Sequence, residues 1–152
     1  MTPEDTNTDL ASHLATALAD VVVMYFQVHG AHWNVKGPDF AEYHEFFESI
    51  YEDVYSSIDP IAENIRKLGH PRAPSTLEEF LAWRTFGDVR SSNDSTSTLT
   101  ADLLTSNTQV LSTLQAAFAS AESVNEQGIM NFLAERIDMH QKWGWQLRAS
   151  LG

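Results

Sequence analysis

Five side chains that can bind a metal recur at a regular spacing in this sequence. His44 and Glu48 are four residues apart, and so are Asp59 and Glu63. Residues four apart on a helix lie on one face, where two such side chains can reach one metal ion. A further imidazole, His32, precedes the first pair. Imidazole and carboxylate ligands together suit iron(II), manganese or zinc, so the pattern predicts a metal site.

The two pairs share one helix face but cannot share one ion. Glu48 and Asp59 are eleven residues apart, about three helical turns, which separates the pairs by about 16 Å along the axis. Two copies of this helix, packed antiparallel about a two-fold axis, would bring the first pair of one chain against the second pair of the other. The spacing therefore predicts an isologous dimer with two equivalent sites, each reached by His32 of its own chain.

The residues between and around these pairs predict an all-helical protein. Apolar residues recur every three or four positions in four long segments, and a polar stretch between the second and third contains a short helix that Ser75 or Thr76 can cap. We expect one ferritin-like four-helix bundle over residues 1–152, with a polar tail at residues 1–7 and the short extra helix in the crossover between helices two and three. The long helices are expected at about residues 8–35, 40–68, 97–123 and 126–150.

Composition restricts the classes of function. The chain has 152 residues, 43% of them hydrophobic, and no cysteine, which excludes disulfides, zinc–thiolate sites and iron–sulfur clusters. The formal net charge of −12 fits a protein that attracts cations and argues against binding the phosphate backbone of nucleic acid. No basic start precedes an apolar run, and no uninterrupted apolar stretch reaches about 18 residues. We expect a cytoplasmic protein with no membrane span.

One continuous segment of the chain resembles a known family. The stretch AHWNVKGPDFAEYHEFFESIYEDVYSSIDPIAENIRKLG contains HWNVKG, then F-x-x-x-H-x-x-x-E, then D-x-x-A-E and a closing LG. This is similar to the signature region of the Dps family, the DNA-binding proteins from starved cells. The resemblance extends over most of the chain, including the helical layout and a C-terminal W-x-L-R. It implies a hollow dodecamer that oxidises iron(II), preferentially with hydrogen peroxide, and stores the ferric mineral against oxidative damage.

The resemblance also assigns roles to residues. The family's ferroxidase ligands fall on His32, His44 and Glu48 of one subunit and on Asp59 and Glu63 of its neighbour. Iron is then the metal that is bound and oxidised, with zinc as a competitor for the same ligands.

Three further positions bear on the resemblance. Trp33 occupies the place of an aromatic residue close to the iron, where it can intercept oxidising equivalents. Glu48 stands where the family often has Asp, and Asn64 stands where it often has Arg. Glu126 and Glu135 are the candidates for an acidic iron pore near the start of the last helix.

Three other functions compete with this interpretation. A DNA-compacting protein would need a basic tail, whereas the N-terminus MTPEDTNTD has three acids and no base. A di-iron site inside one bundle would need Glu-x-x-His motifs, and no Glu of this chain has a His three residues on. The third is a non-catalytic helical assembly in which the histidines and acids form only a polar dimer seam.

The remaining histidines and aromatic residues are predicted to pack rather than react. His29 is expected at the surface or an interface, with a contact to the metal site as the alternative, and three other histidines as structural or solvated: His13, His70 and His140. Phe46 and Phe47 are assigned to the dimer interface. Trp143 and Trp145 cannot share a helix face, so one is expected in the core and the other at a subunit contact.

Overall fold

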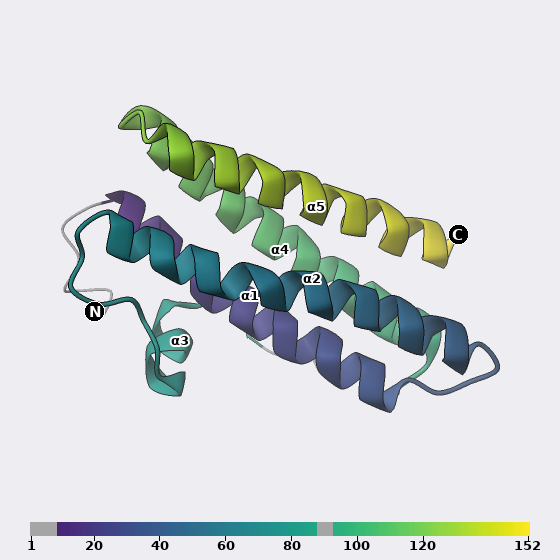
Figure 1. The fold of residues 1–152 in the computed structure, drawn as a ribbon. Coiled ribbons are helices and arrows are strands. Elements are labelled where there is room, and N and C mark those ends of the chain that lie inside the picture. The colour runs from purple at the N-terminus through teal and green to yellow at the C-terminus, as the bar shows by residue number, and fades with distance from the viewer. Residues whose placement is uncertain (1–8, 88–92) are drawn as a thin grey trace.

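The computed structural model describes residues 9–87 and 93–152. Within these residues, each named element of secondary structure is an α-helix (Figure 1). The expected tail at residues 1–7 lies outside the described residues. Each predicted helix is present, and the ends of the four long helices differ from the expectation by at most one residue. The helices are α1 (Asp9–Asn34), α2 (Phe40–Lys67), α3 (Leu77–Trp83), α4 (Thr96–Ser123) and α5 (Gln127–Leu151).

The long connection between α2 and α4 is a crossover, as the sequence predicted. α1 and α2 form one antiparallel pair and α4 and α5 form another (Figure 1). The Lys36 N–H donates to the Asp94 carbonyl at 2.9 Å, so α4 begins beside the turn between α1 and α2. α2 and α4 therefore start at the same end, and the chain between them runs the length of the bundle. That connection distinguishes a ferritin-like bundle from a simple up-and-down one.

α1 is the central element of the core because it packs against α2, α3 and α4. Its segment Leu10–Asn34 is long and apolar enough to cross a membrane by composition alone, but 67% of its most apolar window is buried inside the bundle. The contacts with the other helices therefore account for the apolar composition of α1.

Local signals in the sequence set the helix ends. The Thr76 hydroxyl accepts a hydrogen bond from the Glu79 N–H at 3.2 Å and caps α3, as predicted. Gly37 has a φ of 127° in the turn before α2, a conformation that is strained for any residue with a Cβ. This turn brings the end of α1 and the start of α2 together.

A buried polar network fixes α2 against α4 and α5. Arg136 of α5 donates two hydrogen bonds to Asp53 of α2, at 2.8 and 2.9 Å, and the Trp143 indole donates a third at 2.7 Å. His140 is fully buried, with its Nδ1 2.8 Å from the Asn107 side-chain oxygen of α4. His140 is thus structural, one of the two roles expected for it.

The aromatic residues divide between core and surface in a way that corrects one expectation. Phe47 is fully buried among the core side chains, so assigning it to the dimer interface was wrong. Phe46 is half-buried and faces the end of α5. Trp143 lies in the core with 6% exposure, whereas Trp145 is 61% exposed, which confirms that only one of the two packs in the core.

Candidate metal site

Two imidazoles face one another where α1 ends and α2 begins. The rings of His32 and His44 stack with centroids 3.7 Å apart and an interplanar angle of 15°. The Nδ1 atom of His32 lies 2.7 Å from the His44 carbonyl oxygen, and the Nδ1 atom of His44 lies 2.7 Å from the His32 carbonyl oxygen. A carbonyl oxygen only accepts, so each Nδ1 carries the proton. Each Nε2 atom is left with its lone pair, which is the form of histidine that binds a metal.

Glu48 follows His44 by one turn of α2 and is tied to a neighbouring aromatic residue. The Tyr51 side chain interacts electrostatically with the Glu48 carboxylate. Burial raises the pKa of Tyr51, and the nearby charges of Glu48 and Glu52 raise it further. Tyr51 also presents its ring edge to His32, with centroids 5.2 Å apart and an angle of 67°. This tyrosine therefore contacts two of the candidate ligands at once.

The other two candidate ligands lie farther along α2. Asp59 and Glu63 are both exposed, three and four turns beyond Glu48. Across residues 9–87 and 93–152 of a single chain, no three His, Asp or Glu side chains gather at one metal position. One chain thus places the two histidines together and leaves the second acid pair apart from them.

His29 joins the site to a cluster of aromatic rings. Its ring stacks on Tyr51, with centroids 4.0 Å apart and an angle of 11°, and also contacts Trp33 at 4.2 Å. Its Nδ1 atom is 2.9 Å from the Tyr25 hydroxyl. Burial lowers the pKa of His29, and the electrostatic coupling to the neighbouring imidazole of His32 lowers it further, because two cations side by side would repel one another. His29 is thus packed among aromatic rings rather than free at the surface.

The sequence also contains a pattern that predicts this cluster, in addition to the spacing of the candidate ligands. Tyr25, His29 and His32 are spaced by four and three residues along α1, and His44, Glu48 and Tyr51 repeat that spacing along α2. Both sets therefore occupy one helix face each, and the two faces meet. Apolar periodicity by itself assigns Tyr25 and Tyr51 only to packing.

Comparison with known proteins identifies the family. A family model, the ferritin-like domain, matches residues 11–152. The DNA protection during starvation protein of Helicobacter pylori is 29% identical over 133 residues, which cover 88% of this chain and 92% of that protein. The chain belongs to the Dps family. Another similar protein, a low temperature-induced protein of Nostoc sp., is 30% identical over 87% of this chain and 74% of its own length.

A solved Dps structure agrees with the fold. The crystal structure of a Dps protein from Vibrio cholerae, described as a member of a superfamily of ferritin-like diiron-carboxylate proteins, matches with a TM-score of 0.88 and 27% identity. The match covers 94% of this chain and 89% of that one. The expected family and the expected all-helical, ferritin-like fold are therefore both confirmed.

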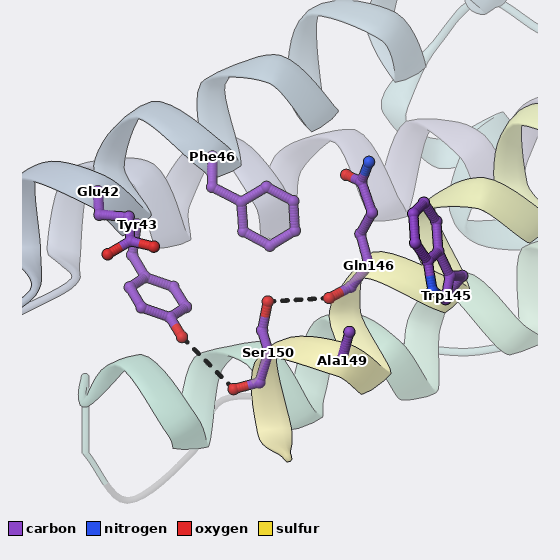
Figure 2. Close-up of a pocket in the computed structure, with 7 residues that line it drawn as sticks. All are labelled: Glu42, Tyr43, Phe46, Trp145, Gln146, Ala149 and Ser150. Carbon is purple, nitrogen blue, oxygen red and sulfur yellow. Dashed lines mark hydrogen bonds between the residues drawn. The ribbon is translucent and has the colours of Figure 1, made fainter.

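A groove of about 290 Å³ lies elsewhere on this Dps chain, between the start of α2 and the end of α5 (Figure 2). The Tyr43 hydroxyl reaches the Ser150 carbonyl at 3.5 Å on one side, and the Trp145 ring stands on the other. Among the described residues that line it, Glu42 is the only acid and none is a histidine. The groove is therefore separate from the candidate metal site. The two pore candidates, Glu126 and Glu135, are both exposed, one at the N-cap of α5 and one within it.

Proposed function

We propose that this chain is a ferroxidase that oxidises iron(II), with hydrogen peroxide as its preferred oxidant, and keeps the ferric product inside a hollow homo-oligomer. The observation that carries the proposal is the reciprocal anchoring of His32 and His44. Because each imidazole donates Nδ1–H to the main chain of the other residue, both Nε2 lone pairs are available without prior rearrangement. Membership of a family that includes a diiron-carboxylate protein supports iron as the metal.

The remaining ligands would come from a second copy of the chain. In this proposal Asp59 and Glu63 of the partner subunit approach His32, His44 and Glu48. Carboxylates favour the ferric state because their negative charge offsets the added positive charge. Zn²⁺ accepts the same imidazole and carboxylate donors and would compete with iron for them.

An exposed apolar surface beside the site supports that second copy. Trp33 is 64% exposed and Tyr55 is 61% exposed, and both contact the aromatic cluster around His29. On α3, Leu77 and Leu81 lie four residues apart and are 67% and 55% exposed. Large apolar side chains that stay exposed on one chain are places where a partner protein can bind, both beside the candidate site and on α3. We infer that other subunits cover these side chains, and that the dodecamer implied by the family resemblance is built from dimers that share the site.

The chemistry follows from the electron count of peroxide. Reducing hydrogen peroxide to two waters takes two electrons, whereas one electron releases a hydroxyl radical. Two iron(II) ions at one site supply both electrons, so the O–O bond is cleaved without a free radical. Trp33 lies against His29 beside the site, where its indole can intercept a stray oxidising equivalent. Protection against oxidative damage in the cytoplasm would follow from this pathway. The acidic N-terminus still argues against DNA binding.

Iron(II) oxidation by limiting peroxide tests the proposal. We expect His44→Ala and Glu63→Ala each to slow oxidation by about tenfold or more while the assembly stays intact, since each removes a ligand. Glu45→Ala is the matched control, because Glu45 is an exposed acid of the same helix outside the proposed ligand set. Absorbance follows the ferric product, and gel filtration shows whether the iron travels with the protein. Unchanged oxidation rates in both ligand variants would contradict the ferroxidase proposal. They would favour the alternative, a non-catalytic assembly in which the histidines and acids form only a polar dimer seam.

A further inference from the structure

Three aromatic side chains line the groove between the start of α2 and the end of α5 (Figure 2). The rings of Tyr43 and Phe46 meet edge to face, with centroids 6.3 Å apart and an interplanar angle of 71°. Trp145 lies on the opposite side of the groove and is 61% exposed, with no ring contact to any other described residue. The volume of about 290 Å³ is close to the lower end of the range for small-molecule sites.

One carboxylate sets the charge of this groove. Glu42 is exposed and is the only charged side chain among the described residues that line it. Within the described part of the chain, no Lys or Arg forms an ion pair with Glu42. The negative end of the α5 dipole lies on one side and the positive end of α2 on the other, so the two helix ends oppose one another. The carboxylate therefore leaves the groove with a net negative charge.

Aromatic rings and a single acid together select a class of ligand. The face of an aromatic ring attracts a cation, most strongly when the ring is that of Trp. A metal ion would need several oxygen or imidazole ligands, whereas Glu42 is the only acid among the described lining residues and none of them is a histidine. An uncharged apolar ligand would gain nothing from the carboxylate. An organic ammonium ion uses both the rings and the charge.

The hydrogen bonds in the groove favour a methylated ammonium ion over a primary one. A primary ammonium has three N–H donors, and each needs an acceptor once it leaves water. The Ser150 carbonyl already receives the Tyr43 hydroxyl at 3.5 Å, and the Gln146 carbonyl accepts from the Ser150 hydroxyl at 2.8 Å. A quaternary ammonium has no N–H donor, and its methyl groups can pack directly against the rings.

We propose that this groove binds a small organic cation with a methylated ammonium group, which lies against the three aromatic rings with Glu42 as its counter-ion. None of the five proposed metal ligands lines the groove. The proposal therefore does not depend on the ferroxidase function, and neither result decides the other.

Choline is the probe for this site, and the assembled protein is the sample. Saturation-transfer NMR observes the ligand, and calorimetry measures its affinity at constant ionic strength. We expect saturable binding, with the strongest saturation at the N-methyl protons. The neutral analogue 3,3-dimethyl-1-butanol has nearly the same shape and should bind about tenfold more weakly, because it lacks the charge. Ethanolamine, which has the charge but no methyl groups, should also bind more weakly than choline.

Two exposed positions supply the variants. Trp145→Ala removes one ring and should weaken choline binding by about fivefold or more, while Trp145→Phe, which keeps a ring, should retain most of it. Glu42→Gln should also weaken choline binding and should reduce the preference for choline over its neutral analogue. Glu45→Gln is the matched control, since Glu45 is an exposed acid of the same helix that does not line the groove. Gel filtration verifies that each variant assembles as the wild type does.

Four results would each overturn the proposal. Equal affinity for choline and its neutral analogue would show that the groove recognises apolar shape alone. Tighter binding of ethanolamine would exclude a preference for methylated ammonium. Equal weakening in Glu45→Gln and Glu42→Gln would reduce the effect to the overall charge of the protein. No saturable binding at millimolar choline would show that the groove is closed to cations in the assembly.

Discussion

At the scale of single residues, the structure shows two ways in which this chain holds a histidine side chain. His32 and His44 are held by main-chain carbonyls and keep a free nitrogen each. His140 instead contacts protein on both ring nitrogens, with Asn107 at Nδ1 and Arg136 at Nε2. A histidine that is satisfied on both sides has no lone pair to offer a metal. The same residue type is therefore a candidate ligand in one place and a structural contact in the other.

The burial of His140 predicts how stability depends on pH. Burial, with the positive charge of Arg136, lowers the pKa of His140 from 6.5 to about 3. Between pH 6.5 and about pH 3, the unfolded chain binds a proton at His140 that the folded chain does not. The free energy of unfolding therefore falls as the pH drops through this range. The expected contribution is about 1.4 kcal/mol per pH unit. Burial by itself would raise the pKa of Asp53, but the hydrogen bonds from Arg136 and Trp143 lower it below its usual value of 3.8. Protonation of Asp53 therefore removes further stability below about pH 3.8.

Urea unfolding at pH 6, 5 and 4 measures this contribution. His140→Gln should be less stable than the wild type at neutral pH because packing and hydrogen bonds are disturbed, yet lose less stability per pH unit. Gln141→Ala, at an exposed position of α5 beside His140, removes no titratable group and should keep the wild-type slope. All comparisons need one protomer concentration, since assembly adds to apparent stability. Equal slopes in wild type and His140→Gln would show that His140 is protonated in the folded state.

At the scale of elements, the crossover is held to the bundle by one buried carboxylate. Asp20 of α1 is fully buried and accepts hydrogen bonds from the Thr85 N–H at 2.7 Å, the Thr85 hydroxyl at 2.6 Å and the Thr113 hydroxyl at 2.7 Å. Thr85 follows α3 by two residues, and Thr113 belongs to α4. Asp20 therefore fixes the end of α3 against two long helices, beside the apolar surface of α3 that we assign to the subunit contact.

Removing this carboxylate should loosen α3 more than the rest of the bundle. We expect Asp20→Ala to leave the Thr85 N–H and hydroxyl without an acceptor, whereas the Thr113 hydroxyl can still donate to the Gln109 carbonyl, and to cost about 3 kcal/mol of stability. Hydrogen exchange should become faster around α3 and Thr85, while the middle of α4 stays protected. Asp138→Ala, at an exposed acid of α5, serves as the control and should leave both quantities within about 0.5 kcal/mol of wild type. Uniformly faster exchange in Asp20→Ala would contradict a local role.

The elements also show which structural features a sequence can predict. Helix α2 continues through Pro60, although proline costs a helix interior about 3 kcal/mol. It does so because core residues recur on both sides, at Val54, Ile61 and Ile65. The same periodicity is enough to predict the long helices, and the length of the polar connection predicts the crossover. Periodicity also explains the error at Phe47, which lies on the stripe of Ile50 and Val54 and not on that of His44 and Glu48.

Contacts between distant parts of the chain cannot be predicted in this way. Asp53 and Arg136 are 83 residues apart, and nothing in their local sequence pairs them. Spacing on α2 places the candidate ligands on one face, and the structure puts His32 beside His44. The hydrogen bonds that fix their ring nitrogens depend on the turn between α1 and α2, which no periodicity describes.

At the scale of the whole molecule, the decisive question is whether one site takes residues from two chains. A single chain holds His32 and His44 together and carries Asp59 and Glu63 about 16 Å or more along α2 from Glu48. With a formal net charge of −12, two such chains repel one another at long range. Contact between them must therefore come from apolar burial, and metal bound by acids from both chains would add to it.

Complementation between variants tests the shared site directly. In a dimer of one His44→Ala chain and one Glu63→Ala chain, one of the two sites has lost both residues and the other has kept both. Random mixing makes about half of the dimers of this kind, so co-expressed variants should recover about a quarter of the wild-type iron oxidation rate, although each alone is nearly inactive.

The matched control mixes His44→Ala with Glu48→Ala. These two residues belong to the same side of each site, so every site in every dimer lacks at least one ligand, and no recovery is expected. Two different affinity tags, used in sequence, isolate the mixed assemblies before the assay. Recovery in the control as well as in the test pair would mean that the losses are not site-specific. No recovery in either would place all the ligands of a site within one chain, which would require α2 to bend far more than this structure shows.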